Sequence, residues 1–135
     1  ALTAELTPPQ NTNGSAVALR HQGGGARAEA LAGFPTARKA AALLQTHDPL
    51  TVLLWLMAHT EDTNLYHRGG AEGAALVKVR SAAILAAPPE QRVTLTQALD
   101  DALIGRWLSP GGSADLLALA LFLNIFFTAF HFFGK

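Results

Sequence analysis

The stretch EDTNLYHRGG, residues 61–70, gathers side chains that could bind and transform a phosphate-bearing substrate. Asp62, Asn64, His67 and Arg68 lie within about two helical turns, so several of them can converge on one side. Arginine can grip a phosphate with paired hydrogen bonds, aspartate can hold Mg²⁺ or accept a proton, and histidine exchanges protons near neutral pH. The stretch therefore predicts a site for an anionic substrate.

A purely structural interpretation of the same stretch is also open. Asp62 or Thr63 could cap a helix, and Gly69 and Gly70 could form a turn that leaves the neighbouring polar side chains in solvent. This interpretation explains the glycines, but it does not explain so many polar groups together in an alanine- and leucine-rich chain. We therefore favour a functional site.

A second stretch, SPGGSADLL at residues 109–117, predicts a helix start that could bind phosphate. Gly111 and Gly112 precede an apolar helix that Ser113 is placed to cap, and their backbone N–H groups would lie at the positive end of its dipole. Asp115, expected in the first helical turn, would repel a phosphate unless a cation lay between them, which favours Mg²⁺. The alternative is an ordinary turn and cap.

A third stretch, GARAEALAGFP at residues 25–35, predicts a short amphipathic helix that ends at Gly33, followed by a helix that begins at Pro35. Its charged side chains are Arg27 and Glu29. Taken alone, they are expected to be solvated on a helix surface. This stretch therefore indicates a functional site only in combination with the other two stretches.

Helices are expected to position these stretches, because apolar residues recur at helical spacing and no strand alternation or long internal repeat is visible. The expected helices cover residues 26–32, 35–46, 49–59, 72–87 and 89–107, followed by an apolar helix that Ser113 caps. Residues 1–25 contain many prolines, asparagines and glycines and predict loop. The predicted fold class is all-α, a multi-helix bundle with a loop-rich N-terminal segment.

The best-defined helix start is Asp48 followed by Pro49, since aspartate suits the N-cap and proline suits the first helical position. The apolar residues of this helix recur at helical spacing and predict one buried face. They are Leu50, Leu53, Leu54 and Met57.

Composition limits the classes of function. The chain has 135 residues, and its ten basic and ten acidic side chains cancel, so no overall field would draw it to nucleic acid or to an anionic membrane. The length predicts one domain, with its helical part over residues 26–135. Because the chain has no cysteine, disulfides and thiolate chemistry are excluded, and we expect a reducing, cytoplasmic compartment.

The apolar run at residues 116–133 is about the minimum length that crosses a bilayer as a helix. Asn124, Thr128 and His131 interrupt it, and Asp115 stands at its entrance. We therefore expect a helix that is buried in the bundle or covered by a partner, and a membrane span is the less favoured interpretation.

In this order, GARAEALAGFP, EDTNLYHRGG and LIGRWLSPGGSADLLA resemble the C-terminal half of the triphosphoribosyl-dephospho-coenzyme A synthases, over residues 25–121. The resemblance implies an α-helical enzyme that joins ATP to 3′-dephospho-coenzyme A and releases adenine. The product, 2′-(5″-triphosphoribosyl)-3′-dephospho-coenzyme A, is the precursor of a prosthetic group of citrate lyase or malonate decarboxylase. Such a glycosyl substitution passes through an oxocarbenium-like transition state.

The resemblance also implies roles for individual residues. Asp62 would be a metal ligand or catalytic carboxylate, and His67 would be a second catalytic residue, unless its ring only packs. Substrate-binding groups would hold the ribose and the triphosphate: Arg27, Asn64, Arg68, Gly69, Gly70, Gly111, Gly112 and Ser113. Asp115 would help Asp62 to hold Mg²⁺, and Arg27 with Glu29 could instead form a salt bridge that locks the site. The stretches at 61–70 and 109–117 are expected to face each other across one cavity.

The family's enzymes are about twice as long, and their N-terminal half has no counterpart here. We therefore expect this chain to be a piece that works with that half or with another copy of itself. One alternative is a non-catalytic helical module that docks through residues 116–133. Another is a metal-dependent phosphohydrolase built on His47, Asp48, His59 and Asp62, whose spacing lacks the further ligands such a site needs.

Overall fold

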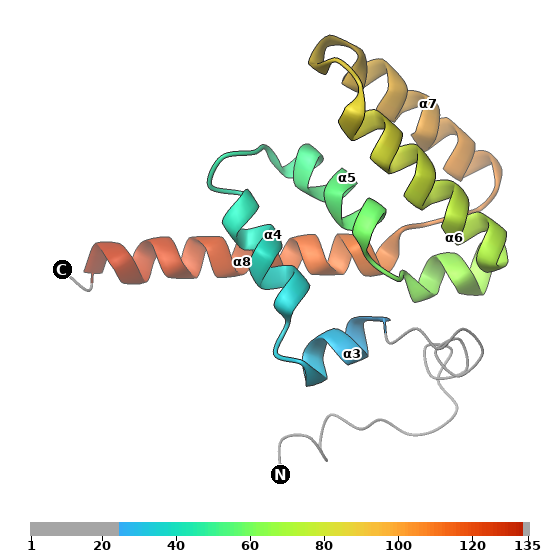
Figure 1. Cartoon of the computed structure of the whole chain (residues 1–135). Helices are drawn as coiled ribbons and strands as arrows, with labels where there is room; N and C mark the ends of the chain where they lie inside the picture. The colour runs from blue at the N-terminus through green and yellow to red at the C-terminus, as the bar shows by residue number, and fades with distance from the viewer. Residues whose placement is uncertain (1–24, 134–135) are drawn as a thin grey trace.

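The computed structural model describes residues 25–133, and this part of the chain is all-α, as predicted. Six α-helices and a short 3₁₀ helix follow one another along it, with no strand among these residues (Figure 1). They are α3 (Gly25–Leu31), α4 (Pro35–Leu43), α5 (Pro49–His59), α6 (Thr63–Ala86), η1 (Pro89–Gln91), α7 (Arg92–Gly105) and α8 (Gly111–Phe133). The loop predicted at 1–25 lies outside the described residues except for Gly25, which already belongs to α3.

Helix α5 joins two apolar clusters because it is apolar around most of its circumference. Its Leu54 and Met57 are buried in a cluster with α6 and α7, whereas Val52 and Leu56 are buried in a cluster with α4 and α8. Burying a side chain of this kind contributes about 1.5–3 kcal/mol. The two clusters hold the α6–α7 hairpin on one side of α5 and the long helix α8 on the other (Figure 1).

The start of α5 matches the prediction. The side chain of Asp48 accepts a hydrogen bond from the Thr51 N–H at 2.7 Å, and Pro49 occupies the first helical position. The predicted buried face is wrong at Leu50, which is 43% exposed. Leu50 lies in the first turn of α5 and lines a groove between α5 and α7.

The helix predicted to begin at residue 72 in fact begins at Thr63, and Asp62 is its N-cap. The polar stretch at 61–70 is therefore mostly the first part of α6. Gly70 interrupts the helix with φ 62° and ψ −166°, a conformation that costs a side-chain-bearing residue far more than glycine. This kink turns the first part of α6 away from the axis of the rest (Figure 1). Helix α4 ends at Leu43, earlier than predicted, because residues 44–46 form a turn.

The predicted start of the last helix is also wrong in detail. Helix α8 begins at Gly111, so Ser113 lies inside the first turn and is not the N-cap, and Asp115 falls beyond that turn. Its first half packs against α4 and α5, with Leu116 and Ala120 buried. Its second half projects beyond the bundle (Figure 1). By length and composition alone, Gly111–Phe130 could cross a membrane, and 17% of its most apolar window is buried.

Candidate active site

Asp62 links the start of α6 to the start of α8 through hydrogen bonds to both carboxylate oxygens. Its Oδ1 accepts from the N–H groups of Asn64 and Leu65 at 3.0 and 3.3 Å. Its Oδ2 accepts from the N–H and the Oγ hydroxyl of Ser113 at 2.8 and 3.1 Å. Both residues are buried, with 4% of Asp62 and 0% of Ser113 exposed. The positive ends of two helices thus share one buried carboxylate.

Glycine allows α8 to start against the start of α6. A Cβ atom at Gly112 would lie 3.1 Å from Cγ of Asp62, and one at Gly111 would collide with the side-chain amide of Asn64. No other residue type allows so close an approach to the fixed carboxylate. The stretches at 61–70 and 109–117 therefore meet, as expected, although they touch directly where a cavity was expected between them.

The stretch at 25–35 reaches the same place from a third side. Gly25, at the start of α3, lies against the side chain of Thr63. The Glu29 carboxylate accepts the N–H of Thr36 at 3.1 and 3.3 Å and so ties α3 to the first turn of α4. The three stretches singled out in the sequence are thus neighbours in space.

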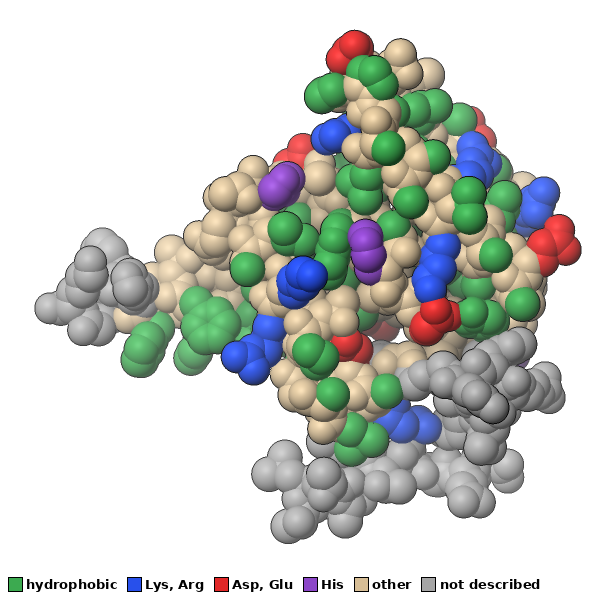
Figure 2. Space-filling view, viewed as in Figure 1, with side chains coloured by type: hydrophobic (Ala, Val, Ile, Leu, Met, Phe, Trp, Pro, Cys, Tyr) green, Lys and Arg blue, Asp and Glu red, His purple; other side chains and the backbone are tan. Residues whose placement is uncertain are grey.

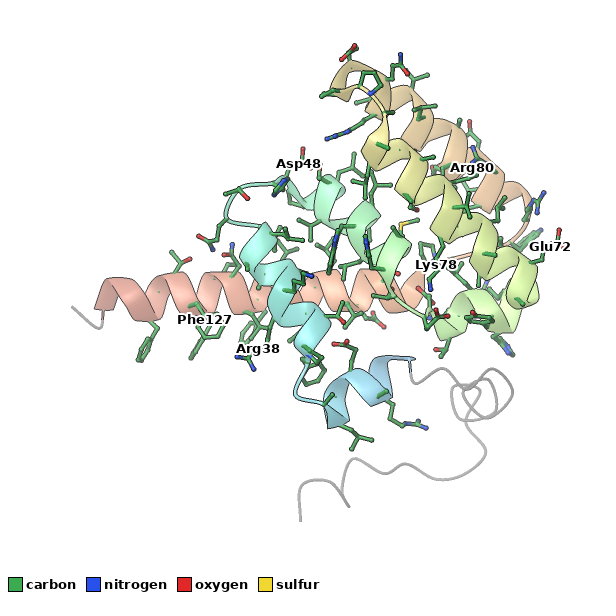
Figure 3. The ribbon with its side chains drawn as sticks, in the orientation of Figure 1. Arg38, Asp48, Glu72, Lys78, Arg80 and Phe127 are labelled. Carbon is green, nitrogen blue, oxygen red and sulfur yellow. The ribbon has the colours of Figure 1, made fainter. Side chains whose placement is uncertain are left out.

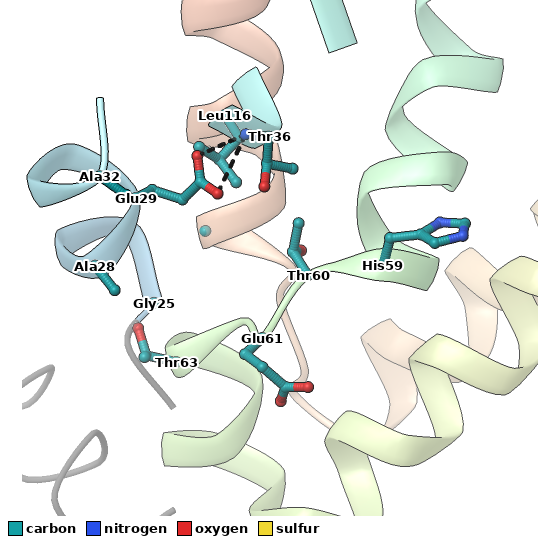
Figure 4. Close-up of a pocket in the computed structure, with 11 residues that line it drawn as sticks. Gly25, Ala28, Glu29, Ala32, Thr36, His59, Thr60, Glu61, Thr63 and Leu116 are labelled. Carbon is teal, nitrogen blue, oxygen red and sulfur yellow. Dashed lines mark hydrogen bonds between the residues drawn. The ribbon is translucent and has the colours of Figure 1, made fainter. Parts of the chain in front are cut away.

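A cavity of about 330 Å³ lies where the three stretches meet (Figure 4). Its polar wall comes from several elements: Glu29 and Thr36, then His59, Thr60, Glu61 and Thr63. Gly112 and Leu116 of α8 complete it. Its volume is near the lower end of the range for small-molecule sites, which suits part of a large substrate.

Glu61 is held at the edge of this cavity by two side chains of α6. The Tyr66 hydroxyl donates to one carboxylate oxygen at 2.7 Å, and Lys78 forms an ion pair with the other. The hydrogen bonds from Lys78 and Tyr66 lower the pKa of Glu61 below its ordinary value. The same contact with the Glu61 anion raises the pKa of Tyr66.

His59 and Thr60 are fixed by contacts within α5 and with α8. The His59 Nδ1 lies 2.8 Å from the carbonyl oxygen of Trp55, and the two rings stack with centroids 4.9 Å apart. The Thr60 hydroxyl donates to the Leu56 carbonyl at 2.8 Å and lies 3.3 Å from the Ser113 hydroxyl. These contacts give the cavity a preformed wall.

Several predicted substrate-binding residues lie away from this cavity. Arg68 reaches the Trp107 carbonyl with Nη1 at 3.5 Å, Gly69 packs against Leu108, and Gly70 forms the kink of α6. His67 and Arg68 are exposed on the first part of α6. The structure thus separates the second half of the stretch at 61–70 from the cavity.

Other predicted residues lie beside the cavity without forming its wall. Arg27 is half-buried on α3, and Asn64 is exposed with its amide against Gly111. Asp62 and Ser113 stand behind Gly112, which is the one predicted substrate-binding residue in the wall. The proposed contacts of these residues with substrate stay predictions.

The residues predicted to hold Mg²⁺ do not form a ligand set by themselves. The hydrogen bonds to Asp62 use the roughly four acceptor positions that a carboxylate has. Asp115 is exposed on α8. Within residues 25–133, no three histidine, aspartate or glutamate side chains lie close enough together to hold a metal ion. A metal role for Asp62 and Asp115 remains a prediction.

The phosphohydrolase alternative has no site in the described part of the chain. Asp48 is occupied as the cap of α5, and its pKa is lowered chiefly by the hydrogen bond from Thr51. The His47 ring contacts the Thr46 hydroxyl and the Leu43 carbonyl before the start of α5, whereas His59 is the last residue of α5. The histidines and aspartates of this alternative therefore do not converge.

Sequence reasoning missed Glu61 and Thr63 as cavity residues. Both lie in the stretch at 61–70. Their position on either side of Asp62 was the one feature of the sequence that could have indicated them as cavity residues. Lys78, the ionic partner of Glu61, is 17 residues further along the chain, beyond the kink at Gly70. No local pattern pairs them.

Fold and site together define an all-helical protein in which three polar, glycine-containing stretches build one cavity. The family model described as "CitG: ATP:dephospho-CoA triphosphoribosyl transferase" matches residues 1–131, and the chain belongs to this family. The family recognised from the three stretches is thereby confirmed. No solved structure matches the chain.

Several curated relatives carry the corresponding enzyme name. The chain is 43% identical, over 128 residues, to the 2-(5″-triphosphoribosyl)-3′-dephosphocoenzyme-A synthase of Pectobacterium atrosepticum, with 83% of this chain and 40% of that protein covered. The probable synthase of Albidiferax ferrireducens is 41% identical, with 87% and 43% covered. The probable synthase of Salmonella gallinarum is 45% identical, with 76% and 38% covered. The chain thus spans about two fifths of the length of these relatives.

Proposed function

We propose that this chain is part of an enzyme that transfers the triphosphoribosyl group of ATP to 3′-dephospho-coenzyme A and releases adenine. Family membership supports the reaction. The observation that carries the proposal for this chain is the cavity that all three stretches line, held together by the Asp62–Ser113 contact and by Gly25 against Thr63. The product would serve as the precursor of a prosthetic group of malonate decarboxylase or citrate lyase.

The cavity offers groups suited to a sugar more than to a triphosphate. Hydroxyls and carboxylates dominate its polar wall, at Glu29, Thr60, Glu61 and Thr63. The positive end of the α8 dipole is already matched by the Asp62 carboxylate, which would oppose a phosphate placed directly against it. We therefore infer that the ribose of ATP occupies the cavity and that the triphosphate extends out of it.

Mg²⁺ is proposed to enter with the triphosphate. This ion keeps several waters and is commonly held by substrate phosphates with one or two carboxylates, so it needs no complete cage of protein ligands. Asp115 is the exposed carboxylate near the start of α8 that could contribute one ligand. The proposed compartment is the cytoplasm, in keeping with a chain that has no cysteine.

The proposal is tested by measuring adenine released from ATP. The chain is combined with a separately produced segment of the Pectobacterium relative. This segment is the part of that protein to which the chain has no match. Adenine release that requires 3′-dephospho-coenzyme A, and that fails when either segment is omitted, supports the proposal. A stable complex of the two segments that releases no adenine would contradict it.

The exposed half of α8 supports a second role, in assembly. Five of its large apolar side chains are each more than half exposed: Phe122, Ile125, Phe126, Phe127 and Phe130. Figure 2 shows apolar side chains along the projecting arm, and Figure 3 shows Phe127 pointing away from the bundle. An apolar surface of this kind indicates a protein contact.

We propose that this face binds the part of the enzyme that the chain does not span. The family match continues to residue 131, so the arm belongs to the family domain, and the relatives carry the additional chain that could cover it. Replacing Phe126 by glutamate should abolish complex formation with the added segment in analytical ultracentrifugation. Glutamate at Phe122 should do the same, whereas Val79→Glu, on α6, should have no effect. Sedimentation of the isolated chain as a stable dimer through the same residues would instead assign the face to a second copy.

A further inference from the structure

Glu29 is the carboxylate directed towards the cavity where the three stretches meet. Two acidic residues stand among the described residues that line this cavity, Glu29 and Glu61. Glu61 is bound to Tyr66 and Lys78, which are not part of the wall, and Figure 4 shows its carboxylate directed away from the cavity. The Glu29 side chain instead crosses from α3 towards Thr36, at the start of α4 (Figure 4). Glu29 is therefore the acidic group that a molecule in the cavity would meet.

The Glu29 carboxylate is held in place and still has free acceptor positions. Phe34, the N-cap residue of α4, makes no side-chain hydrogen bond to the helix, and Glu29 supplies the acceptor from α3 instead. The Thr36 N–H donates to both carboxylate oxygens, at 3.3 Å to Oε1 and 3.1 Å to Oε2. A carboxylate has about four acceptor positions, so one shared N–H leaves a lone pair free on each oxygen. The result is a pair of neighbouring acceptor atoms with a fixed orientation.

The rest of the wall suits a neutral group that carries hydroxyls. Thr36, Thr60 and Thr63 supply hydroxyls, whereas none of the described lining residues is a lysine or an arginine. A carboxylate with two free oxygens can accept from two hydroxyls on adjacent carbons, and such charge-assisted hydrogen bonds are stronger than neutral ones. Ribose presents a pair of this kind at C2′ and C3′, whereas a phosphate would be repelled by the same carboxylate.

We propose that Glu29 binds the 2′ and 3′ hydroxyls of the ATP ribose and makes the site specific for ribonucleotides. This inference rests on the proposed function, in which that ribose occupies the cavity. Transfer of the anomeric carbon leaves both hydroxyls unchanged, so Glu29 takes no part in bond making and acts as a binding and specificity residue. Because the same carboxylate receives the Thr36 N–H, it would join the sugar to both α3 and α4.

Nucleotide binding tests this role without any chemical step. Dissociation constants for ATP, 2′-deoxyATP and 3′-deoxyATP are measured by isothermal titration calorimetry with Mg²⁺, in the absence of 3′-dephospho-coenzyme A. The chain is measured alone and together with the added segment of the Pectobacterium relative. Each deoxynucleotide should bind at least about tenfold more weakly than ATP, because it leaves an acceptor position of a charged group unpaired. In Glu29→Gln this ratio should fall to about threefold or less, since glutamine keeps one uncharged acceptor oxygen.

The ratio compares nucleotides within one variant, so effects of Glu29 on folding or on the charge of the triphosphate cancel. Glu90→Gln, an exposed change in η1, is the control with the same loss of charge and should keep the wild-type ratio. Absence of discrimination, or of nucleotide binding, in both wild-type preparations would overturn the inference. So would a Glu29→Gln variant that keeps the ratio, or a Glu61→Gln variant that loses it in place of Glu29→Gln.

The result for Glu29 can be distinguished from the result for the transferase. Discrimination against the deoxynucleotides that disappears in Glu29→Gln, in a protein that releases no adenine, would count against the proposed function alone. Adenine release from 3′-deoxyATP with the same kcat/KM as from ATP would count against the role of Glu29 alone.

Discussion

The Asp62 carboxylate accepts both the backbone N–H and the side-chain hydroxyl of Ser113, 51 residues further along the chain, at 2.8 and 3.1 Å. One side chain thereby caps α6 and anchors the first turn of α8. The cavity lies beside this contact, so its shape depends on the Asp62–Ser113 pair even though neither side chain forms its wall.

Replacing Asp62 by alanine should destabilise the fold strongly. The substitution leaves buried N–H groups of α6 and α8 and the Ser113 hydroxyl without their acceptor, and each such loss costs about 1–3 kcal/mol. We expect the free energy of unfolding in urea to fall by about 3 kcal/mol or more. Asp115→Ala, on the exposed surface of α8, is the control and should change it by less than about 0.5 kcal/mol. Similar small losses in both variants would contradict a stabilising role for Asp62.

Gly112→Ala should be destabilising because the new Cβ would lie 3.1 Å from Cγ and Oδ1 of Asp62, which four hydrogen bonds hold in place. Separating α8 from α6 to relieve this contact should cost about 1–3 kcal/mol. Gly105→Ala is the matched control, since a Cβ at Gly105, the last residue of α7, has no neighbour within 4 Å. Urea denaturation of the two variants measures the difference. A neutral Gly112→Ala would show that the start of α8 tolerates displacement.

Stability should depend on pH through Asp48. The Thr51 hydrogen bonds lower the pKa of this carboxyl in the folded chain, so its contribution is present above the ordinary pKa and is lost as pH falls through the folded value. Asp48→Ala should cost about 1 kcal/mol at neutral pH and little in acid, below the ordinary range for aspartate. Asparagine at this position caps the helix without a charge, so Asp48→Asn should remove the part of the pH dependence of stability that Asp48 contributes. Unfolding experiments at neutral and acidic pH would measure both effects.

The titration of Tyr66 reports on the Glu61 network. Tyr66 is the one tyrosine of the chain, so the absorbance of tyrosinate follows it alone. The Glu61 anion raises its pKa, and Glu61→Gln should bring the pKa back towards the ordinary value near 10. Glu72→Gln, an exposed change in α6, should leave the titration unaltered. An unchanged titration in Glu61→Gln would mean that the Tyr66–Glu61 hydrogen bond does not persist in solution.

Local sequence patterns predicted the fold class and the helix starts at Pro35 and Pro49 correctly. The Asp48–Pro49 cap satisfies backbone groups two or three residues away, so its geometry is encoded within one turn. At Asp62 the same kind of information left a helix cap and a substrate or metal carboxylate both open, and the structure shows the cap. A cap and a substrate carboxylate have the same residue type and similar neighbours, and only the packing of α8 distinguishes them.

Thus the sequence alone determined an all-α chain, the three stretches that matter and the family to which they belong. Tertiary structure decided which side chains of those stretches share a cavity. Arg68 reaches the Trp107 carbonyl, Ser113 binds the Asp62 carboxylate, and Lys78 pairs with Glu61 from beyond the Gly70 kink. These contacts join residues 17 to 51 positions apart in the chain, and tertiary packing rather than local backbone preference sets their distances.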